Sequence, residues 1–399
     1  MDFGLDVLVS GASIAGPAAA FWLRRAGHRV TLVERAVELR EAGQNVDVRG
    51  PAREVLRRMD LEDEALAQNT GERGIRFVDE HDAVLAEFPA GRGDSAGATA
   101  ELEILRGALA AILVKAGESQ VDYEFGDQIM QVVQRGDKVI VAFAGGTQRA
   151  FDLLVIAEGV QSFTRGMVFG EVPTRRLGLY TAYGSIERHP DDDDWWTWFN
   201  AVGGRAITVR PDNVGTTRVA LSFLSSRQNY QDLKLAEQRE ALRVNYSGVE
   251  WKAPRILDAL ASTKELYVDD LTQVRAPTLV RGRVVLLGDA AWCATPISGM
   301  GTSLALTGAY VLAGELTSAS VTEDGLRAFE RRMRPLVRRA QKLPPGAPRL
   351  AHPKSRAGVA ALRTALRVVG SRPVQIAARR MSSTTSASDS LPRYESLGG

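Results

Sequence analysis

Apolar and polar positions along the first 35 residues predict two strands joined by a helix. An apolar run at 7–9 leads into a turn with two glycines and an alanine-rich segment, and a second run at 30–33 ends in Glu34 and Arg35. Short continuous apolar runs are typical of buried strands, and the segment between them has the length of a helix. The order strand, turn, helix, strand predicts the start of an α/β sheet.

The turn at 11–16 has the sequence GASIAG and the features of a phosphate site. Gly11 permits a tight turn, Gly16 lets the helix approach the strand, and the free amides of the helix N-terminus face the phosphates. Glu34 lies about twenty residues further on, where a carboxylate accepts hydrogen bonds from ribose hydroxyls. Ser13 replaces the second glycine of the usual motif. We therefore predict a dinucleotide site; the alternative is an ordinary turn between a strand and a helix.

Further along, the pattern predicts more strands of the same sheet. Glu158 and Gly159 end a buried, parallel-type strand, and Gly288 and Asp289 end a later one that precedes a glycine-rich helix start. Both endings place polar groups at the carboxyl edge of a sheet, where α/β proteins bind their ligands. Strands are expected at 121–125, 129–134, 138–143, 151–159 and 282–288, with helices ending near 117 and covering 302–316, 323–343 and 355–369.

Between residues 175 and 280 the sequence pattern changes to alternating apolar and polar residues with many aromatics. It predicts strands at 179–186, 194–200, 205–210 and 216–223 and a helix at 232–246. Such alternation is typical of an antiparallel sheet with one covered face. The fold class is therefore α/β, with a Rossmann-like dinucleotide-binding domain, an inserted antiparallel-sheet substrate domain and a C-terminal helical segment. The expected boundaries are 1–174 plus 281–343, 175–280 and 344–399, and residues 391–394 are expected to dock back on the body.

Composition excludes several classes of protein. The 399 residues are 45% hydrophobic and 25% charged, as in ordinary globular proteins, and no stretch resembles a signal peptide or a membrane span. Cys293 is the only cysteine, which excludes an intramolecular disulfide and a paired redox site. The four histidines share no ligand spacing. We expect a cytoplasmic protein without a metal.

Charge is unevenly distributed along the chain. Between residues 325 and 380, fifteen positions are Lys or Arg and the only acid is Glu330. Arginines at helical spacing commonly form a solvated face or bond carbonyl oxygens, so we expect neither nucleic acid nor a membrane as a partner. The acidic run at 191–194 is expected to be a solvated loop.

These motifs, in this order, resemble the class A flavoprotein monooxygenases, the group of p-hydroxybenzoate hydroxylase and the tetracycline-inactivating monooxygenases. The resemblance covers nearly the whole chain. It rests on the N-terminal turn with Glu34 and Arg35, the Glu103-x-x-Arg106-x-x-Leu109 pattern, the strand ending in Glu158 and Gly159, and Gly288-Asp289 followed by Pro296, Gly299 and Gly301.

The resemblance implies FAD as a non-covalent cofactor. The diphosphate would lie at 11–16, the adenosine ribose at Glu34 and the ribitol at Asp289, while the loop 296–302 would lie against the flavin ring, where a helix N-terminus favours negative charge. The implied cofactor-binding residues are Gly11, Ser13, Ile14, Ala15, Gly16, Glu34, Arg35, Arg40, Arg106, Gln128, Glu158, Gly159, Gly288, Asp289, Pro296, Gly299, Met300, Gly301 and Thr302.

The resemblance also implies a reaction. NADH or NADPH would bind transiently and reduce the flavin, O2 would form a flavin C4a-hydroperoxide, and one oxygen atom would hydroxylate or insert into an aromatic or polycyclic, natural-product-like substrate. The cofactor supplies this chemistry and the protein positions it. Arg106, Pro296 and Gly299 would position the flavin, with no general base assigned. The candidate substrate contacts are Tyr183, Arg205, Trp292 and Phe223.

Three positions depart from the family pattern: Glu158 replaces an Asp, Trp292 a His and Thr302 an Asn. We expect FAD binding to survive these changes, which bear instead on the handling of nicotinamide and peroxide. Trp292 either stacks on the flavin or substrate or packs in the core. Two alternatives to a monooxygenase remain: an FAD oxidoreductase of the same fold that moves hydride without oxygen transfer, and a non-catalytic flavin-binding protein.

Overall fold

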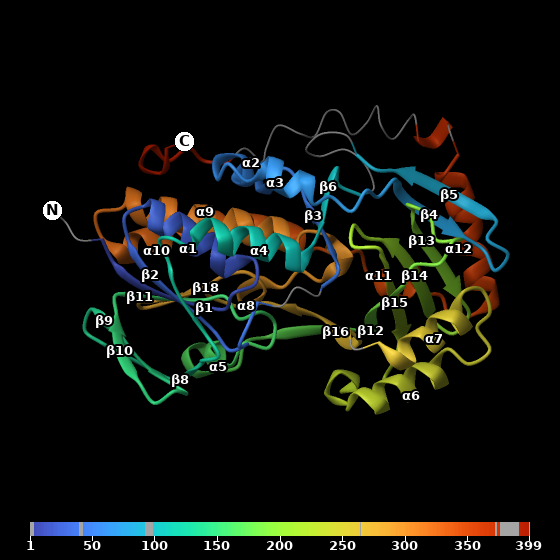
Figure 1. Cartoon of the computed structure of the whole chain (residues 1–399), viewed down its shortest axis with the longest axis horizontal. Coiled ribbons are helices and arrows are strands. Elements are labelled where there is room, and N and C mark those ends of the chain that lie inside the picture. The colour runs from blue at the N-terminus through green and yellow to red at the C-terminus, as the bar shows by residue number, and fades with distance from the viewer. Residues whose placement is uncertain are drawn as a thin grey trace.

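Two large sheets organise the computed structural model, which describes residues 4–39, 43–91, 99–263, 265–371, 373–375 and 391–398 (Figure 1). The first sheet has six strands. Their order is β17 (Val280–Arg281), β18 (Val284–Leu286), β11 (Leu153–Ile156), β1 (Asp6–Ser10), β2 (Arg29–Glu34) and β7 (Asp122–Phe125). All neighbours are parallel except β17 and β18. This arrangement confirms the predicted α/β class with a Rossmann-like sheet.

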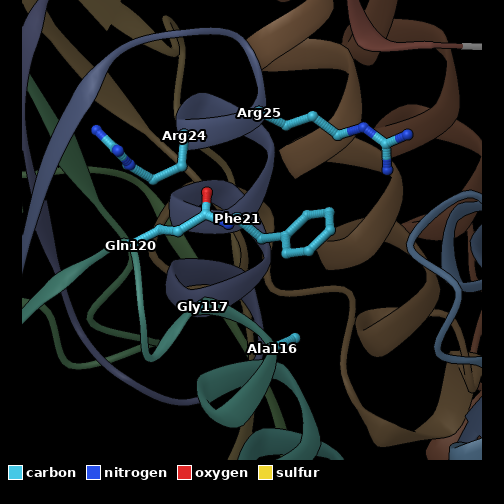
Figure 2. A pocket seen from close by; sticks show the side chains of 6 residues that line it. All are labelled: Phe21, Arg24, Arg25, Ala116, Gly117 and Gln120. Atoms are coloured by element: carbon cyan, nitrogen blue, oxygen red, sulfur yellow. The ribbon is translucent and has the colours of Figure 1, made fainter.

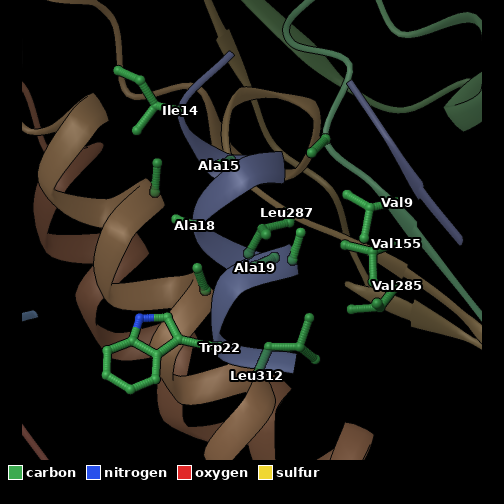
Figure 3. Close-up of a cluster of buried hydrophobic side chains, with 14 of the residues drawn as sticks. Val9, Ile14, Ala15, Ala18, Ala19, Trp22, Val155, Val285, Leu287 and Leu312 are labelled. Atoms are coloured by element: carbon green, nitrogen blue, oxygen red, sulfur yellow. The ribbon is translucent and has the colours of Figure 1, made fainter. Parts of the chain in front are cut away.

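Helices and a small sheet cover the two faces of this first sheet (Figure 1). Figure 3 shows why the first helix packs closely: Ala15, Ala18 and Ala19 lie beside the valines of three adjacent strands, and their small side chains keep the helix near the sheet. The helices on this face are α1 (Ala15–Arg25), α4 (Arg106–Gly117), α9 (Gly301–Ser318) and α10 (Thr322–Ala340). The small sheet covers the other face (Figure 1) and consists of β8 (Ile129–Arg135), β9 (Lys138–Phe143) and β10 (Gln148–Phe151). Helix α5 (Phe163–Phe169) follows later in the chain.

The second sheet takes strands from two distant parts of the chain. Its order is β16 (Tyr267–Val274), β12 (Thr174–Glu187), β15 (Thr216–Leu224), β14 (Arg205–Pro211), β13 (Trp196–Ala201), β4 (Gly74–Val78) and β5 (Val84–Pro89). The range 175–280 therefore does not supply the whole sheet, because β4 and β5 come from the N-terminal part and β4 runs parallel to β13. One face packs on α6 (Leu235–Asn245) and α7 (Ala253–Ser262) through a separate apolar core.

Shorter elements connect the two sheets and close the C-terminal side. They are β3 (Asn45–Val48) paired with β6 (Leu102–Leu105), then α2 (Pro51–Arg58), α3 (Glu62–Ala67), α8 (Asp289–Trp292), α11 (Ala347–Ala351) and α12 (Arg356–Val369). The end of α12 packs on β5, since a Cβ on Gly370 would lie 2.6 Å from the Cβ of Ala86. Among the described residues, no helix is long and apolar enough to cross a membrane.

The C-terminal residues dock on the first domain, as predicted. The ring of Tyr394 lies 5.3 Å from that of Tyr310, and its hydroxyl donates to Glu315 Oε1 at 2.6 Å. The carbonyl oxygen of Pro392 accepts from Arg58 Nη1 at 3.1 Å. A Cβ on Gly314 would overlap the Tyr394 ring, so the helix surface is shaped for this segment.

The basic region near the C-terminus and the acidic run at 191–194 both contain residues with defined protein partners. In the basic region, Arg334 donates to the carbonyl oxygen of Ala276 at 2.8 Å and Arg332 binds Glu315, as expected for arginines that bond carbonyls and neighbouring acids. The acidic run at 191–194 is a loop with three exposed acids, as expected, and Asp192 is the exception. Asp192 is buried and accepts two hydrogen bonds from Arg255, at 2.7 and 3.0 Å, so it anchors this loop to α7.

Candidate active site

The glycine turn lies between β1 and α1 and leaves no room for side chains at its two glycines. Gly11 has a φ of 108°, and an added Cβ would lie 2.5 Å from the carbonyl oxygen of Ala157. A Cβ on Gly16 would lie 1.8 Å from the carbonyl oxygen of Gly11. Ser13 is exposed, and Ile14, the N-cap of α1, makes no side-chain cap. The start of this helix therefore has backbone amides without a side-chain cap, which is what the diphosphate prediction requires.

Glu34 ends β2 beside this turn. Its Oε2 accepts from the amide of Ala12 at 2.8 Å and its Oε1 from the amide of Ala36 at 2.9 Å. Each carboxylate oxygen has a second lone pair, so ribose hydroxyls can still bind there. Arg35 is exposed at the next position, and the chain near Gln128 returns here because the amide of Asp127 donates to the carbonyl oxygen of Glu34 at 3.2 Å. Arg40 lies outside the described residues.

Glu158 is held by protein donors at the end of β11. Its carboxylate accepts from Ser10 Oγ at 2.6 Å, Ser162 Oγ at 2.6 Å, and both the amide and hydroxyl of Thr164, at 3.1 and 2.5 Å. Gly159 follows with a φ of 83°. These bonds use the carboxylate to fix the connection to α5, so the longer Glu fills a structural position where the family has Asp.

The second glycine motif lies against the first. A Cβ on Gly288 would lie 2.8 Å from the Cβ of Ala15, so Asp289 stands beside the N-terminus of α1. A Cβ on Gly301 would lie 3.8 Å from Asp289 Oδ1, which brings the start of α9 to the same place. Residues far apart in the sequence thus form one continuous surface, and the residues present fit the diphosphate and ribitol of a flavin dinucleotide.

The loop before α9 completes this surface. Pro296 begins a 3-10 turn, Pro296–Ser298, and Gly299 has a φ of 62°, with an added Cβ 3.6 Å from Asp47 Oδ2. Met300 is the N-cap of α9 and makes no side-chain cap, and Thr302 is in the first turn. An 18-residue helix therefore presents uncapped amides at this loop, which favours negative charge on a bound ring.

Arg106 stands where the two sheets meet. It begins α4, its amide donates to the carbonyl oxygen of Gln44 at 3.0 Å, and its side chain is exposed. Burial raises the pKa of Asp289, and the charge of Arg106 opposes the rise. Arg106 acts in the same way on Tyr183 and Tyr267 of the second sheet.

The second sheet separates the predicted substrate residues by face. Tyr183 pairs with Tyr267, with ring centroids 5.2 Å apart, on the face toward Arg106. Phe223 pairs with Arg205 and with Tyr180 on the other face, beneath α6. Phe223 is 1% exposed in the apolar core there. Arg205 donates to the carbonyl oxygen of Asn245 at 2.7 Å, so the structure does not bring Arg205 and Phe223 to the site.

Trp292 is also buried away from the site surface. It is 1% exposed, its ring lies 6.2 Å from that of Phe329, and a Cβ on Gly308 would lie 2.9 Å from its indole. Of the two possibilities raised by the sequence, the geometry is that of core packing. Neighbouring Cys293 is buried, and burial together with the charge of Asp289 raises the pKa of its thiol.

We expect Trp292→Phe to affect stability and not ligand binding. The smaller ring should cost about 1–2 kcal/mol of unfolding free energy because it leaves space beside Phe329. The dissociation constant for FAD, measured by fluorescence titration, should stay within about twofold of wild type, since a factor of two is under 0.5 kcal/mol. Unchanged stability with weakened FAD or substrate binding would contradict this placement.

Sequence reasoning missed Tyr267 and Asp269, because strand β16 was not predicted. Residues 267–274, YVDDLTQV, do not alternate between apolar and polar side chains, so no period-2 signal identifies this strand. The sequence analysis also treated Glu103 only as part of the Glu103-x-x-Arg106 motif and did not predict its ionic contacts. In the structure Glu103 is buried, with Arg210 between it and Glu72.

A small pocket of about 270 Å³ lies at the other end of α1 and is not part of this site. Figure 2 shows that its two arginines point in opposite directions. Arg24 donates to the carbonyl oxygen of His28 at 2.7 Å and Arg25 to that of Arg58 at 2.9 Å. These arginines cap chain carbonyls and do not converge on a ligand.

Comparison with known proteins agrees with this geometry. Residues 4–342 match the family described as FAD binding domain. The chain is 38% identical over 392 residues, 90% of each chain, to the flavin-dependent monooxygenase eupH of Phoma sp, and 34% identical over 337 residues to a flavin-dependent monooxygenase of Legionella longbeachae, covering 83% of this chain and 85% of that one. Among solved structures, the tetracycline destructase Tet(55) aligns over 99% of this chain and 100% of its own, at 28% identity and a TM-score of 0.80. The chain therefore belongs to the FAD-binding family of flavin-dependent monooxygenases.

Proposed function

We propose that this enzyme uses NADH or NADPH and O2 to hydroxylate, or insert oxygen into, an aromatic or polycyclic substrate in the cytoplasm. When bound, FAD would accept hydride from the nicotinamide, react with O2 and supply one oxygen atom. The observation that carries the proposal is the position of Arg106, whose charge acts both on Asp289 in the cofactor surface and on the tyrosine pair of the second sheet. A ring between these groups would contact both sheets.

The chain's own residues would bind and orient the reactants. The turn at 11–16 and Glu34 would hold the diphosphate and adenosine ribose, and Asp289 would accept from the ribitol. The uncapped start of α9 would stabilise negative charge on the reduced ring. Tyr183 and Tyr267 would form an aromatic surface for the substrate, with hydroxyls kept neutral because burial raises their pKa, that of Tyr267 to about 12.

Relatives support a substrate of this kind without identifying it. The fungal relatives at 35–38% identity are named as flavin-dependent or FAD-dependent monooxygenases. The structural relatives Tet(51) and Tet(55), at 28–29% identity, are named tetracycline destructases. The face carrying Tyr183 and Tyr267 suits such a flat molecule.

The test uses the FAD-loaded protein, ¹⁸O2 and a panel of hydroxylated naphthalenes and anthraquinones, with NADH and NADPH oxidation followed separately. We expect substrate-stimulated oxidation of one nicotinamide and one ¹⁸O atom in the product. Peroxide formation with no label in the product would favour the hydride-transferring alternative. No stimulated oxidation with any compound would favour the non-catalytic alternative, and a purified protein that never takes up FAD would refute all three.

A further inference from the structure

One carboxylate on the tyrosine-bearing face of the second sheet has no protein partner. Asp269 lies on β16 two residues after Tyr267 and pairs with Thr181, two residues before Tyr183. Residues two apart in a strand, and residues directly opposite on paired strands, share a face. Asp269 therefore lies beside the two tyrosine rings. Among the residues that the structure describes, its carboxylate forms no hydrogen bond and no ion pair within 4.0 Å.

Three other acids on or near the second sheet have ion-pair partners. Asp270, on the opposite face of β16, binds Arg176. Asp212 accepts from Arg218 Nε at 2.9 Å, both being buried. The same pattern holds for Asp47 with Arg49, at 2.7 Å. Asp269 is thus the carboxylate of this group whose acceptor capacity the protein does not use.

Charge around Asp269 is set by three groups from different elements. Arg106 of α4 is the one cation acting on it within the described chain, while Asp289 of α8 and Asp270 of β16 are negative. Burial raises the pKa of Asp269, both acids raise it further, and Arg106 lowers it. With two carboxylates and one guanidinium, the surroundings oppose a further negative charge and favour a hydrogen-bond donor.

We propose that Asp269 determines substrate specificity: its carboxylate accepts a hydrogen bond from a hydroxyl or amine on an aromatic ring stacked near Tyr183 and Tyr267, and it discriminates against ring carboxylates. This inference rests on the proposed function, because it assumes that the tyrosine face binds the substrate. It adds the class of substrate: aromatic molecules that present an O–H or N–H group at this edge.

The test measures binding of two matched probes, 2-naphthol and 2-naphthoate, by perturbation of the flavin absorbance spectrum in the FAD-loaded protein without nicotinamide. A hydrogen bond to a charged group corresponds to at least about tenfold in affinity, so we expect wild type to bind 2-naphthol at least tenfold tighter. Asp269→Asn should remove most of this preference, and Asp269→Lys should reverse it. The preference should also fall as the pH is lowered, because protonated Asp269 loses one acceptor.

Glu187→Gln is the matched control, since it removes an exposed acid from the same face of β12 as Tyr183 that is not among the charges acting on Asp269. It should retain FAD and leave the preference unchanged. The proposal is wrong if wild type shows no preference for 2-naphthol, including failure to bind either probe, or if both Asp269 variants keep the wild-type preference. The oxygen-label assay on the same preparations separates the two ideas: a retained preference without labelled product refutes the proposed function and leaves this inference standing.

Discussion

Gly16→Ala should yield a protein that is purified without flavin. The new Cβ would lie 1.8 Å from the carbonyl oxygen of Gly11, a backbone atom that cannot move without displacing the whole turn. We expect the dissociation constant for FAD to rise at least about 100-fold, because the amides of the displaced turn would no longer point toward the diphosphate. The apoprotein should also lose about 2–3 kcal/mol of stability from overpacking between α1 and β1.

The ratio of flavin to protein absorbance after gel filtration measures this effect, and urea unfolding of the apoprotein measures the stability loss. Gly166→Ala is the matched control, because this glycine is in helix α5 and an added Cβ would meet no atom within 4 Å. That variant should stay yellow and gain about 0.5–1 kcal/mol from the better helix propensity of alanine. A fully yellow Gly16→Ala protein would mean that the diphosphate does not lie at this turn.

The glycine turn shows why the cofactor-binding part of the fold could be predicted from the sequence. The turn and the apolar runs on either side of it are local signals, and each glycine marks a place where no Cβ fits. The helices expected at 302–316 and 323–343 correspond to α9 and α10. Apolar positions recur at helical spacing in α10, whereas α9 is apolar nearly all round and buried along its length. The structure then shows what spacing alone could not: Gly288 and Ala15 are in contact, so the two distant motifs share one surface.

The second sheet was harder to predict because its pairing is not local. No sequence feature of β4 or β13 indicates that the two strands pair, because parallel strands are not joined by a short shared turn. The face of each strand was ambiguous for a related reason. Aromatic residues occur on both faces, Tyr183 on one and Phe223 on the other, so hydrophobicity does not reveal which face α6 covers. Register supplied by the structure resolves this ambiguity.

A buried charge cluster joins the second sheet to the β3–β6 pair near the site and supports the second large prediction. Arg210 of β14 donates to Glu72 at 2.7 and 3.1 Å and also contacts Glu103 of β6. Its guanidinium lies 4.0 Å from the ring centroid of Trp196. Both glutamates have side chains that are 1% exposed, so one cation serves two buried carboxylates. Burial and the charge of Asp47 raise the pKa of Glu72, and Arg210 opposes them.

Arg210→Met should destabilise the protein by about 3–5 kcal/mol near neutral pH, because it leaves two buried carboxylates without a cation. The loss should grow as pH rises. The folded-state pKa of Glu72 already lies above its unfolded value, so folding favours the protonated acid and stability falls as pH rises through that pKa. Removing Arg210 raises this pKa further, so the variant should fall further below wild type in stability at pH 8 than at pH 5. Urea unfolding of both proteins at these two pH values measures the difference.

Arg188→Met is the control for this variant, since Arg188 and its partner Asp194 are 36% and 54% exposed and should contribute no more than about 1 kcal/mol. Adding Glu103→Gln to Arg210→Met should restore part of the stability at pH 8, because one buried charge is removed. Equal losses at pH 5 and pH 8 would assign the cost to lost packing against Trp196 instead of charge. A loss that grows with pH would show that Arg210 holds β14 and β6 together chiefly by neutralising buried carboxylates. One of these, Glu103, lies three residues before Arg106 in the chain, so the cluster also supports the start of α4 at the site.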